Sequence, residues 1–110
     1  MRLPNPDQAV VDIEKLRHYC LSAEHPRGRH KARVFAARLG LTAGDAELLR
    51  DTLLDAARTC DAAMGEKDGF GQRYVVEFIM NGPAGRARIH GIWIVRREET
   101  FARFVTCYVA

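Results

Sequence analysis

Residues 25–35 read His25-Pro-Arg-Gly-Arg-His-Lys-Ala-Arg-Val-Phe35, and regular structure resumes within this stretch after a loop. Pro26 and Gly28 interrupt whatever precedes them. From there the apolar residues recur at helical spacing, at Ala32, Phe35, Ala36 and Leu39. The stretch therefore predicts a helix over about residues 29–39, and Gly40 is placed to end it.

Basic side chains crowd the first turn of this helix, namely Arg27, Arg29, His30 and Lys31. A helix N-terminus carries partial positive charge, so an exposed cation there costs a few tenths to about 1 kcal/mol. Such a cluster is expected where something negative binds, because free amide N–H groups and guanidinium or ammonium donors together form a phosphate site. A solvated basic helix end without a ligand is the alternative, since short basic runs are common.

Length and composition are those of one globular domain spanning residues 1–110, with 47% hydrophobic and 28% charged residues. The net charge of +3 permits an acidic partner such as nucleic acid without requiring one. No apolar run reaches transmembrane length, and the N-terminus lacks the hydrophobic region of a signal peptide. We therefore expect a cytoplasmic protein with no membrane partner, unless a larger toxin delivers it into a target cell.

The three cysteines, Cys20, Cys60 and Cys107, are odd in number and far apart on apolar faces of the expected elements. This pattern predicts buried, reduced thiols. No CxxC or HxxxH pair is present, so we expect no zinc site, and nothing in the sequence calls for another metal or a cofactor.

Three helices are expected in the first half of the chain, over about residues 13–21, 29–39 and 43–59. The third is the most regular, and Thr42 and Asp45 resemble a capping box at its start. Residues 61–71 are rich in glycine and predict a loop, with room for a short irregular strand over about 62–64.

Strand-like runs then cover about residues 72–80, 86–97 and 101–109, and residues 81–85 form the first hairpin connection. Helices followed by an antiparallel meander predict an α+β fold. Three N-terminal helices (about 13–59) would pack on one face of a three- to four-stranded antiparallel sheet (about 62–109).

Alternation along the strands predicts two unlike faces. Ala87, Ile89, Gly91, Trp93 and Val95 would face the core, with Trp93 as a core residue. The opposite face of that strand would carry Arg86, Arg88, His90, Ile92, Ile94 and Arg96, and the last strand would add Phe104, Thr106 and Tyr108 to it. Arginine suits phosphate contacts, while His, Tyr and Thr suit acid–base chemistry on a phosphodiester. An ordinary solvent face is the alternative.

Several motifs resemble an uncharacterised bacterial domain family whose members occur alone or as the last domain of large polymorphic toxins. They include Gly28-Arg-His-Lys-Ala-Arg-Val-Phe35, Trp93-Ile-Val-Arg96 and Val105-Thr-Cys-Tyr108. The layout also resembles the barnase–EndoU–colicin–RelE group of metal-independent ribonucleases. The positions that match are His30 and Lys31, Trp93, and Thr106 with Tyr108. Departures are the His-Lys order, a missing proline after Tyr108, and no obvious catalytic acid on the third strand.

This resemblance implies a toxin-type ribonuclease that cleaves RNA by attack of a ribose 2′-hydroxyl, without metal or cofactor. It implies His30 as general base or acid, and Thr106 and Tyr108 as groups that orient the phosphate or supply a proton. Lys31 would stabilise the phosphorane. Arginines would bind the substrate, namely Arg27, Arg29, Arg73, Arg88 and Arg96. RNA and a cognate acidic inhibitor protein are the implied partners.

Two other functions remain open at this point. The chain could be a non-catalytic module of a two-gene, toxin–antitoxin-like system that contacts nucleic acid or an acidic protein through its basic face. It could also be a purely structural domain, with His30 and Tyr108 buried and fully hydrogen-bonded. The ribonuclease hypothesis requires the His30–Lys31 pair to face the same hollow as Thr106 and Tyr108.

Overall fold

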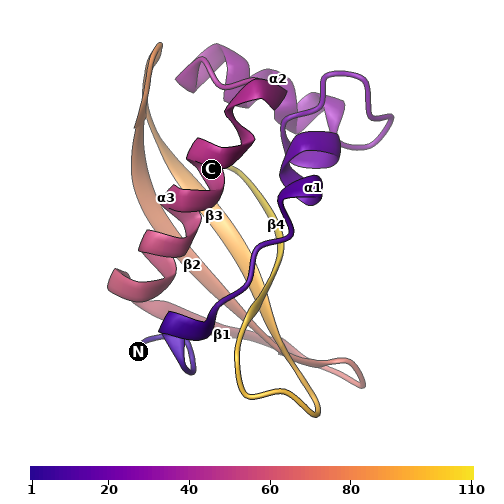
Figure 1. Ribbon diagram of the computed structural model, residues 1–110, viewed down its shortest axis with the longest axis vertical. Helices are drawn as coiled ribbons and strands as arrows, with labels where there is room; N and C mark the ends of the chain where they lie inside the picture. Colours follow the sequence, from indigo (N-terminus) through magenta and orange to yellow (C-terminus); the bar gives the residue numbers. More distant parts are fainter.

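The computed structural model describes residues 1–110, and Figure 1 shows a helical layer packed on a curved sheet. The expected α+β fold is confirmed, with the helices before the sheet in sequence. The helical elements are η1 (Pro6–Gln8), α1 (Ile13–Lys15), the π-helical turn η2 (Leu16–Cys20), α2 (Arg29–Leu39), η3 (Ala43–Asp45) and α3 (Ala46–Thr59). The strands are β1 (Ala62–Lys67), β2 (Gly71–Gly82), β3 (Gly85–Arg96) and β4 (Arg103–Val109). No helix combines the length and apolar character needed to cross a membrane.

The sheet is a fully antiparallel meander in the order β1-β2-β3-β4. The two long central strands, β2 and β3, pair in register over their whole length, from Gly71 opposite Arg96 to Gly82 opposite Gly85. β4 pairs only with β3, so it forms one edge of the sheet. The lead-in touches the start of this edge strand, where Val10 bridges Arg103.

The sequence interpretation of the sheet needs two corrections. Residues 62–67, which were expected mainly as a loop, form β1. Pairing with β2 stabilises this strand, and the glycine-rich local sequence contains no pattern that predicts such pairing. Phe104, expected beside Thr106 and Tyr108, is 2% exposed and packs edge-to-face on Trp93. A β-bulge between the pairs Ile92–Thr106 and Trp93–Phe104 breaks the alternation there.

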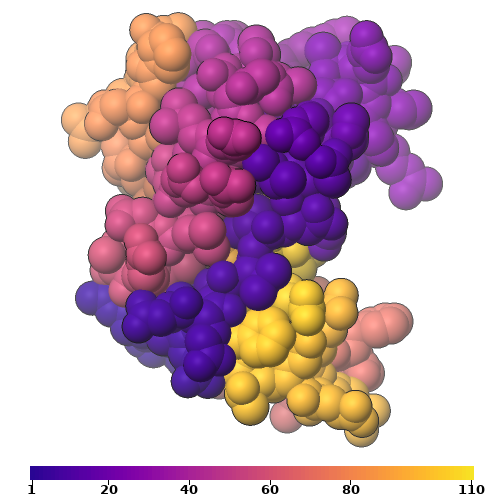
Figure 2. Space-filling model, in the orientation of Figure 1, coloured from indigo at the N-terminus to yellow at the C-terminus, as the bar shows by residue number.

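One hydrophobic core lies between the helices and the inner face of the sheet. Trp93 is 1% exposed, which confirms it as a core residue. Phe35 of α2, Leu53 of α3 and Leu16 of η2 meet it in the same cluster. The indigo N-terminal segment runs across the front of the molecule between α3 and β4 (Figure 2). The opposite face of the sheet carries no helix and is the face on which the polar residues of β2 and β3 lie.

The start and end of α2 are defined by local contacts that the sequence anticipated in part. Gly40 ends the helix with φ 73°, as predicted. At the other end, Nδ1 of His25 accepts the backbone N–H groups of Arg27 and Gly28, both at 3.0 Å. The His25 ring also packs edge-on against Tyr19 at 4.6 Å. These contacts hold the first turn of α2 against η2. Thr42 and Asp45 form the expected capping box before α3.

The expected burial of the thiols is confirmed for Cys20 and Cys107, which are 1% and 0% exposed, whereas Cys60 is partly exposed. The Cys20 thiol lies 3.7 Å from the hydroxyl of Thr106 and hydrogen-bonds to Cys107. Mainly that bond from Cys107, with help from Thr106 and Lys31 and against the cost of burial, lowers the pKa of Cys20 to about 7. The same hydrogen bond and burial raise the pKa of Cys107 well above its ordinary value.

Gly28→Ala should destabilise the protein. A Cβ at Gly28 would lie 2.4 Å from the carbonyl oxygen of Tyr19, so α2 must move away from η2. Overpacking of this kind costs about 1–3 kcal/mol, which urea denaturation would measure. Gly69→Ala is the matched control, because a Cβ at Gly69 meets nothing within 4 Å. Equal unfolding free energies for the two variants would contradict the role given to this contact.

The free energy of unfolding should rise as the pH increases from 7 to 9. Over this window folded Cys20, with its pKa of about 7, has lost a proton that the unfolded thiol keeps until its ordinary pKa of 9.0. The stabilisation is therefore complete above about pH 9 and is lost as the pH falls through 7. Cys20→Ser should abolish this rise in denaturation curves and Cys60→Ser should keep it. A rise that survives in Cys20→Ser would contradict the assignment.

Candidate active site

A row of titratable side chains crosses the open face of the sheet. Strand register places Glu77 of β2 opposite His90 of β3, and His90 opposite Tyr108 of β4. Directly opposite residues on adjacent antiparallel strands point to the same face, with Cβ atoms about 4.5–5.5 Å apart. Three residues that are far apart in the sequence therefore form one continuous line of functional groups.

His90 is the centre of the row. Its Nδ1 lies 3.4 Å from Oε2 of Glu77, an ionic contact somewhat longer than a well-formed hydrogen bond. Its side chain is 23% exposed, whereas that of Glu77 is 47% exposed. Nε2 of His90 has no hydrogen-bond or ion-pair partner in the protein. A carboxylate beside Nδ1 favours the tautomer with the proton on that nitrogen, which leaves the lone pair of Nε2 open to a ligand.

The Tyr108 ring connects this row to the helical layer. It stacks on the His90 ring, with centroids 4.8 Å apart and planes at 25°. Nζ of Lys31, from α2, lies 4.9 Å from the centroid of the same ring. A cation at this distance from an aromatic face is attracted to it, so Lys31 is held beside the sheet rather than free in solvent.

Thr106 lies two residues before Tyr108 on the edge strand β4, opposite Ile92, where its side chain reaches the helical layer. Its hydroxyl is in contact with the Cys20 thiol, and it lines a shallow hollow of about 400 Å³ together with Lys15, Tyr19 and Val105. The candidate site therefore combines the Glu77–His90–Tyr108 row with Lys31 and Thr106. We call these five residues the site cluster.

The residues expected from the sequence are only partly brought together. Lys31 and Tyr108 meet at the end of the row, and Tyr108 is half-buried. Thr106 lies on the same strand, but the hollow that it lines includes neither Lys31 nor Tyr108. His30 is exposed on α2 and makes no hydrogen bond, ion pair or ring contact, and neighbouring helical residues do not share a face. Arg27 and Arg29 are exposed at the start of α2.

The three sheet arginines named from the sequence have different surroundings. Arg88 is exposed and lies two residues from His90 on the same face of β3. Arg73 is ion-paired with Asp68 at 2.6 Å. Arg96 is at the far end of β3, near the carboxylate of Glu99, whose pKa is lowered by its hydrogen bond to Arg103 and, less strongly, by Arg96. Only Arg88 therefore offers an uncompensated charge close to the row.

His90 and Glu77 were missed as site residues, although the face on which His90 lies was predicted correctly. The sequence contained part of the information needed to identify His90, because alternation along the strand placed it on the same face as Arg86 and Arg88. The local sequence pattern does not show which residues lie opposite each other on neighbouring strands, and Glu77 and His90 are 13 positions apart in the chain. Counting back from the hairpin at residues 82–85 would have paired them.

Charge is segregated around the site cluster. Residues 25–44 include five Lys or Arg and no Asp or Glu, and residues 78–97 include four Arg and no acidic residue. The acidic residues are concentrated elsewhere, for example Glu47, Asp51 and Asp55 on α3. No group of three or more His, Cys, Asp or Glu residues is arranged to hold a metal ion.

The site cluster can bind an anion and move a proton. Lys31 supplies positive charge, with Arg88 nearby on β3, the unpaired Nε2 of His90 can accept a proton, and the hydroxyls of Tyr108 and Thr106 can donate hydrogen bonds. Groups of this kind around one anion are what acid–base catalysis at a phosphate requires.

Comparison with known proteins places the chain in a family and a fold. A chain of the solved structure described as a contact-dependent growth inhibition toxin–immunity protein complex from Klebsiella pneumoniae 342 is 18% identical, with a TM-score of 0.70. The match covers 92% of this chain and 99% of that chain, and at this identity it shows a shared fold. No curated protein matches. A family model described as a domain of unknown function, DUF6883, matches residues 2–110, and the protein therefore belongs to the DUF6883 family.

Proposed function

We propose that this protein is a toxin-type endoribonuclease that cleaves RNA without a metal ion, by attack of a ribose 2′-hydroxyl on the neighbouring phosphodiester. The observation that carries the proposal is the row Glu77–His90–Tyr108, with Lys31 against its last member. The contacts bring an imidazole, a phenol and an ammonium group side by side, which supports this proposal. These are the groups that transphosphorylation uses.

His90 is the general base in this proposal. Its Nε2 takes the proton of the 2′-hydroxyl as that oxygen bonds to phosphorus, while Glu77 keeps the other ring nitrogen protonated. The contact between Glu77 and His90 tightens when the imidazole becomes charged, because an imidazolium attracts the carboxylate more strongly. This assignment replaces His30, which has no orienting partner.

Tyr108 is the general acid. As the bond from phosphorus to the 5′-oxygen breaks, the phenol gives its proton to that oxygen and then recovers one from the imidazolium stacked on it. The products are a 2′,3′-cyclic phosphate and a free 5′-hydroxyl. The ammonium group of Lys31 stabilises the charge that gathers on the phosphorane, and Thr106 orients a non-bridging oxygen.

The toxin role rests on the shared fold. The similar solved chain comes from a complex of a growth inhibition toxin with its immunity protein. We infer that this protein acts within such a pair, with RNA as its substrate. Its partner would be an acidic inhibitor that covers the basic surface of α2 and β3. Charge complementarity of that kind accelerates association and selects the partner.

His90→Ala should lower kcat/KM for RNA cleavage by about 10²–10⁴-fold, the usual contribution of a general acid or base. The measurement is cleavage of total RNA in EDTA, with identification of the cyclic phosphate end. His18→Ala is the matched control, because His18 is exposed and ion-paired with Glu14 on another surface. His30→Ala should leave most activity, and loss in His30→Ala with full activity in His90→Ala would reverse the assignment of the base.

Growth of the expressing host and an RNA-binding assay, together with the cleavage assay, distinguish an enzyme from the second candidate, a binding or immunity module with the same fold. The enzyme should inhibit growth of its host on expression unless a cognate inhibitor is co-expressed. A binding module should show salt-dependent association without product. Absence of cleavage by the purified wild type, together with harmless expression, would refute the ribonuclease proposal.

Tyr108→Phe removes the hydroxyl group of Tyr108 and keeps its aromatic ring, so it should distinguish the catalytic role of the hydroxyl from the packing role of the ring. The variant keeps the stacking on His90 and the contact with Lys31, so its stability should stay close to that of the wild type. Cleavage of RNA should fall by about 10²-fold or more, since proton donation to the leaving oxygen is lost. A uridine 3′-phosphate ester with p-nitrophenol as leaving group needs no such proton, so its cleavage should be nearly unaffected. An equal loss on both substrates would show that the hydroxyl does not act as the acid.

A further inference from the structure

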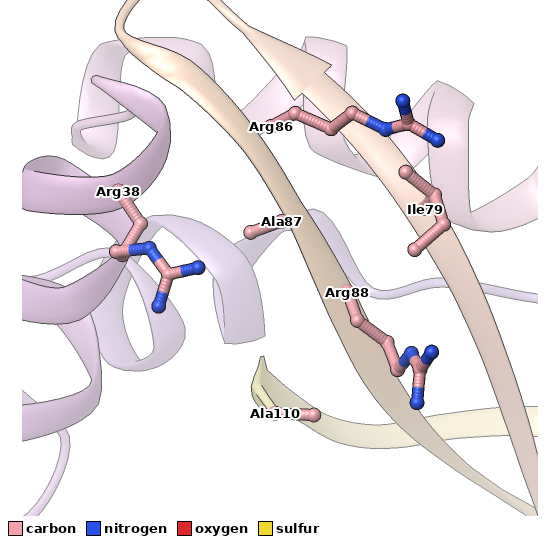
Figure 3. A pocket seen from close by; sticks show the side chains of 6 residues that line it. All are labelled: Arg38, Ile79, Arg86, Ala87, Arg88 and Ala110. Atoms are coloured by element: carbon pink, nitrogen blue, oxygen red, sulfur yellow. The ribbon is translucent and has the colours of Figure 1, made fainter.

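A groove lined by three arginines lies immediately beside the site cluster. Its volume is about 410 Å³, and its walls are Arg38, Ile79, Arg86, Ala87, Arg88 and Ala110 (Figure 3). None of the three arginines makes an ion pair, and no acidic side chain lines the groove. The three arginines therefore differ from Arg73 and Arg103, which are paired with Asp68 and Glu99.

The groove exists because β4 is shorter than β3. The register of β4 on β3 begins at the pair Ile89–Val109, so Arg86 and Ala87 have β2 on one side only. The end of α2 comes close to this free stretch, since a Cβ at Gly85 would lie 2.8 Å from the carbonyl oxygen of Arg38. Figure 3 shows Arg38 reaching from the helix on one side of β3, Arg86 extending on the other side to lie beside Ile79, and Arg88 running along the strand away from Ile79.

Strand geometry aligns this groove with the row. Arg86, Arg88 and His90 are every second residue of β3 and therefore lie in line on one face, where each step of two residues advances about 6.6–6.8 Å. The pair Ile79–Arg88 is thus the neighbour of the pair Glu77–His90. A step of this size is comparable to the spacing of successive phosphates along a single strand of nucleic acid, and guanidinium groups bind phosphate oxygens in a bidentate manner.

We propose that this groove binds the phosphodiesters that continue from the reacting phosphate on one side, with Arg88 at the next phosphate and Arg86 at the one beyond, while Arg38 adds positive charge from the helix side of β3. The inference rests on the proposed ribonuclease function and adds the form of its substrate. That substrate is single-stranded RNA extending at least two nucleotides past the cleavage point. Ile79, which is 46% exposed, supplies an apolar surface for a ribose or base between the phosphates.

The test compares a dinucleotide with a single-stranded hexanucleotide. Wild-type protein should cleave the longer substrate with a kcat/KM at least tenfold higher. The double variant Arg38→Ala/Arg86→Ala should lose most of this advantage and leave cleavage of the dinucleotide within twofold. Arg97→Ala is the charge-matched control for one arginine, because it lies just past the opposite end of β3. It should affect neither substrate.

Salt dependence gives a second readout that does not need catalysis. Binding of a fluorescein-labelled hexanucleotide to His90→Ala protein should weaken with salt, and each lost phosphate contact reduces the slope by about 0.7 for single strands. The double variant loses the contact with one phosphate and should therefore reduce the slope by about 0.7, on the same basis. A poly-glutamate peptide of equal charge should bind more weakly and respond less to the two substitutions.

Failure of the groove proposal differs from failure of the proposed function. Equal effects of the double variant on the dinucleotide and the hexanucleotide, or an unchanged salt slope, would overturn the groove proposal even if the wild type cleaves RNA. Stronger, arginine-dependent binding of poly-glutamate would overturn it in favour of an acidic protein. If the wild type cleaves nothing, a reduced slope in the double variant still supports a nucleic-acid groove, and only the enzyme proposal fails.

Discussion

The β-bulge at Val105 determines which side chains of β4 reach the candidate site. Phe104 and Tyr108 are separated by an even number of residues, so strict alternation would put both on the same face of the sheet. The extra residue in β4 lets Phe104 pack on Trp93 in the core while Tyr108 stacks on His90 on the open face. The hydrophobic core and the site cluster therefore depend on one local irregularity, because without it one of the two aromatic side chains would lie on the wrong face.

The position of α2 is the second requirement, because this helix supplies the cation. Hydrogen bonds from two backbone N–H groups to His25, and the close approach of Gly28 to Tyr19, hold the first turn of α2 on η2. Lys31 then reaches the Tyr108 ring at the edge strand. A histidine within the basic motif thus has a structural role, and it positions a lysine that takes part in the proposed chemistry.

The positive charge of the protein is concentrated on α2 and β3. A net charge of +3 is small, but residues 25–44 and 78–97, which contain α2 and β3, include no Asp or Glu, whereas α3 carries Glu47, Asp51 and Asp55. The resulting field favours an extended anion along the open face and the free end of β3. The proposed RNA substrate and the proposed acidic inhibitor would bind the same surface, since both are negatively charged.

The sequence by itself determined the α+β order of elements, the bounds of α2, the capping box at Thr42, and the core position of Trp93, because these follow from local periodicity and turn chemistry. Residue type and position in a motif also led to Lys31, Thr106 and Tyr108 as candidate site residues, and their roles stay predictions. Only the tertiary structure decided that β1 pairs with β2 and that Glu77 and His90 stand beside Tyr108. Cross-strand register and bulges join residues that are distant in the chain, and no local pattern records which residue will lie opposite another.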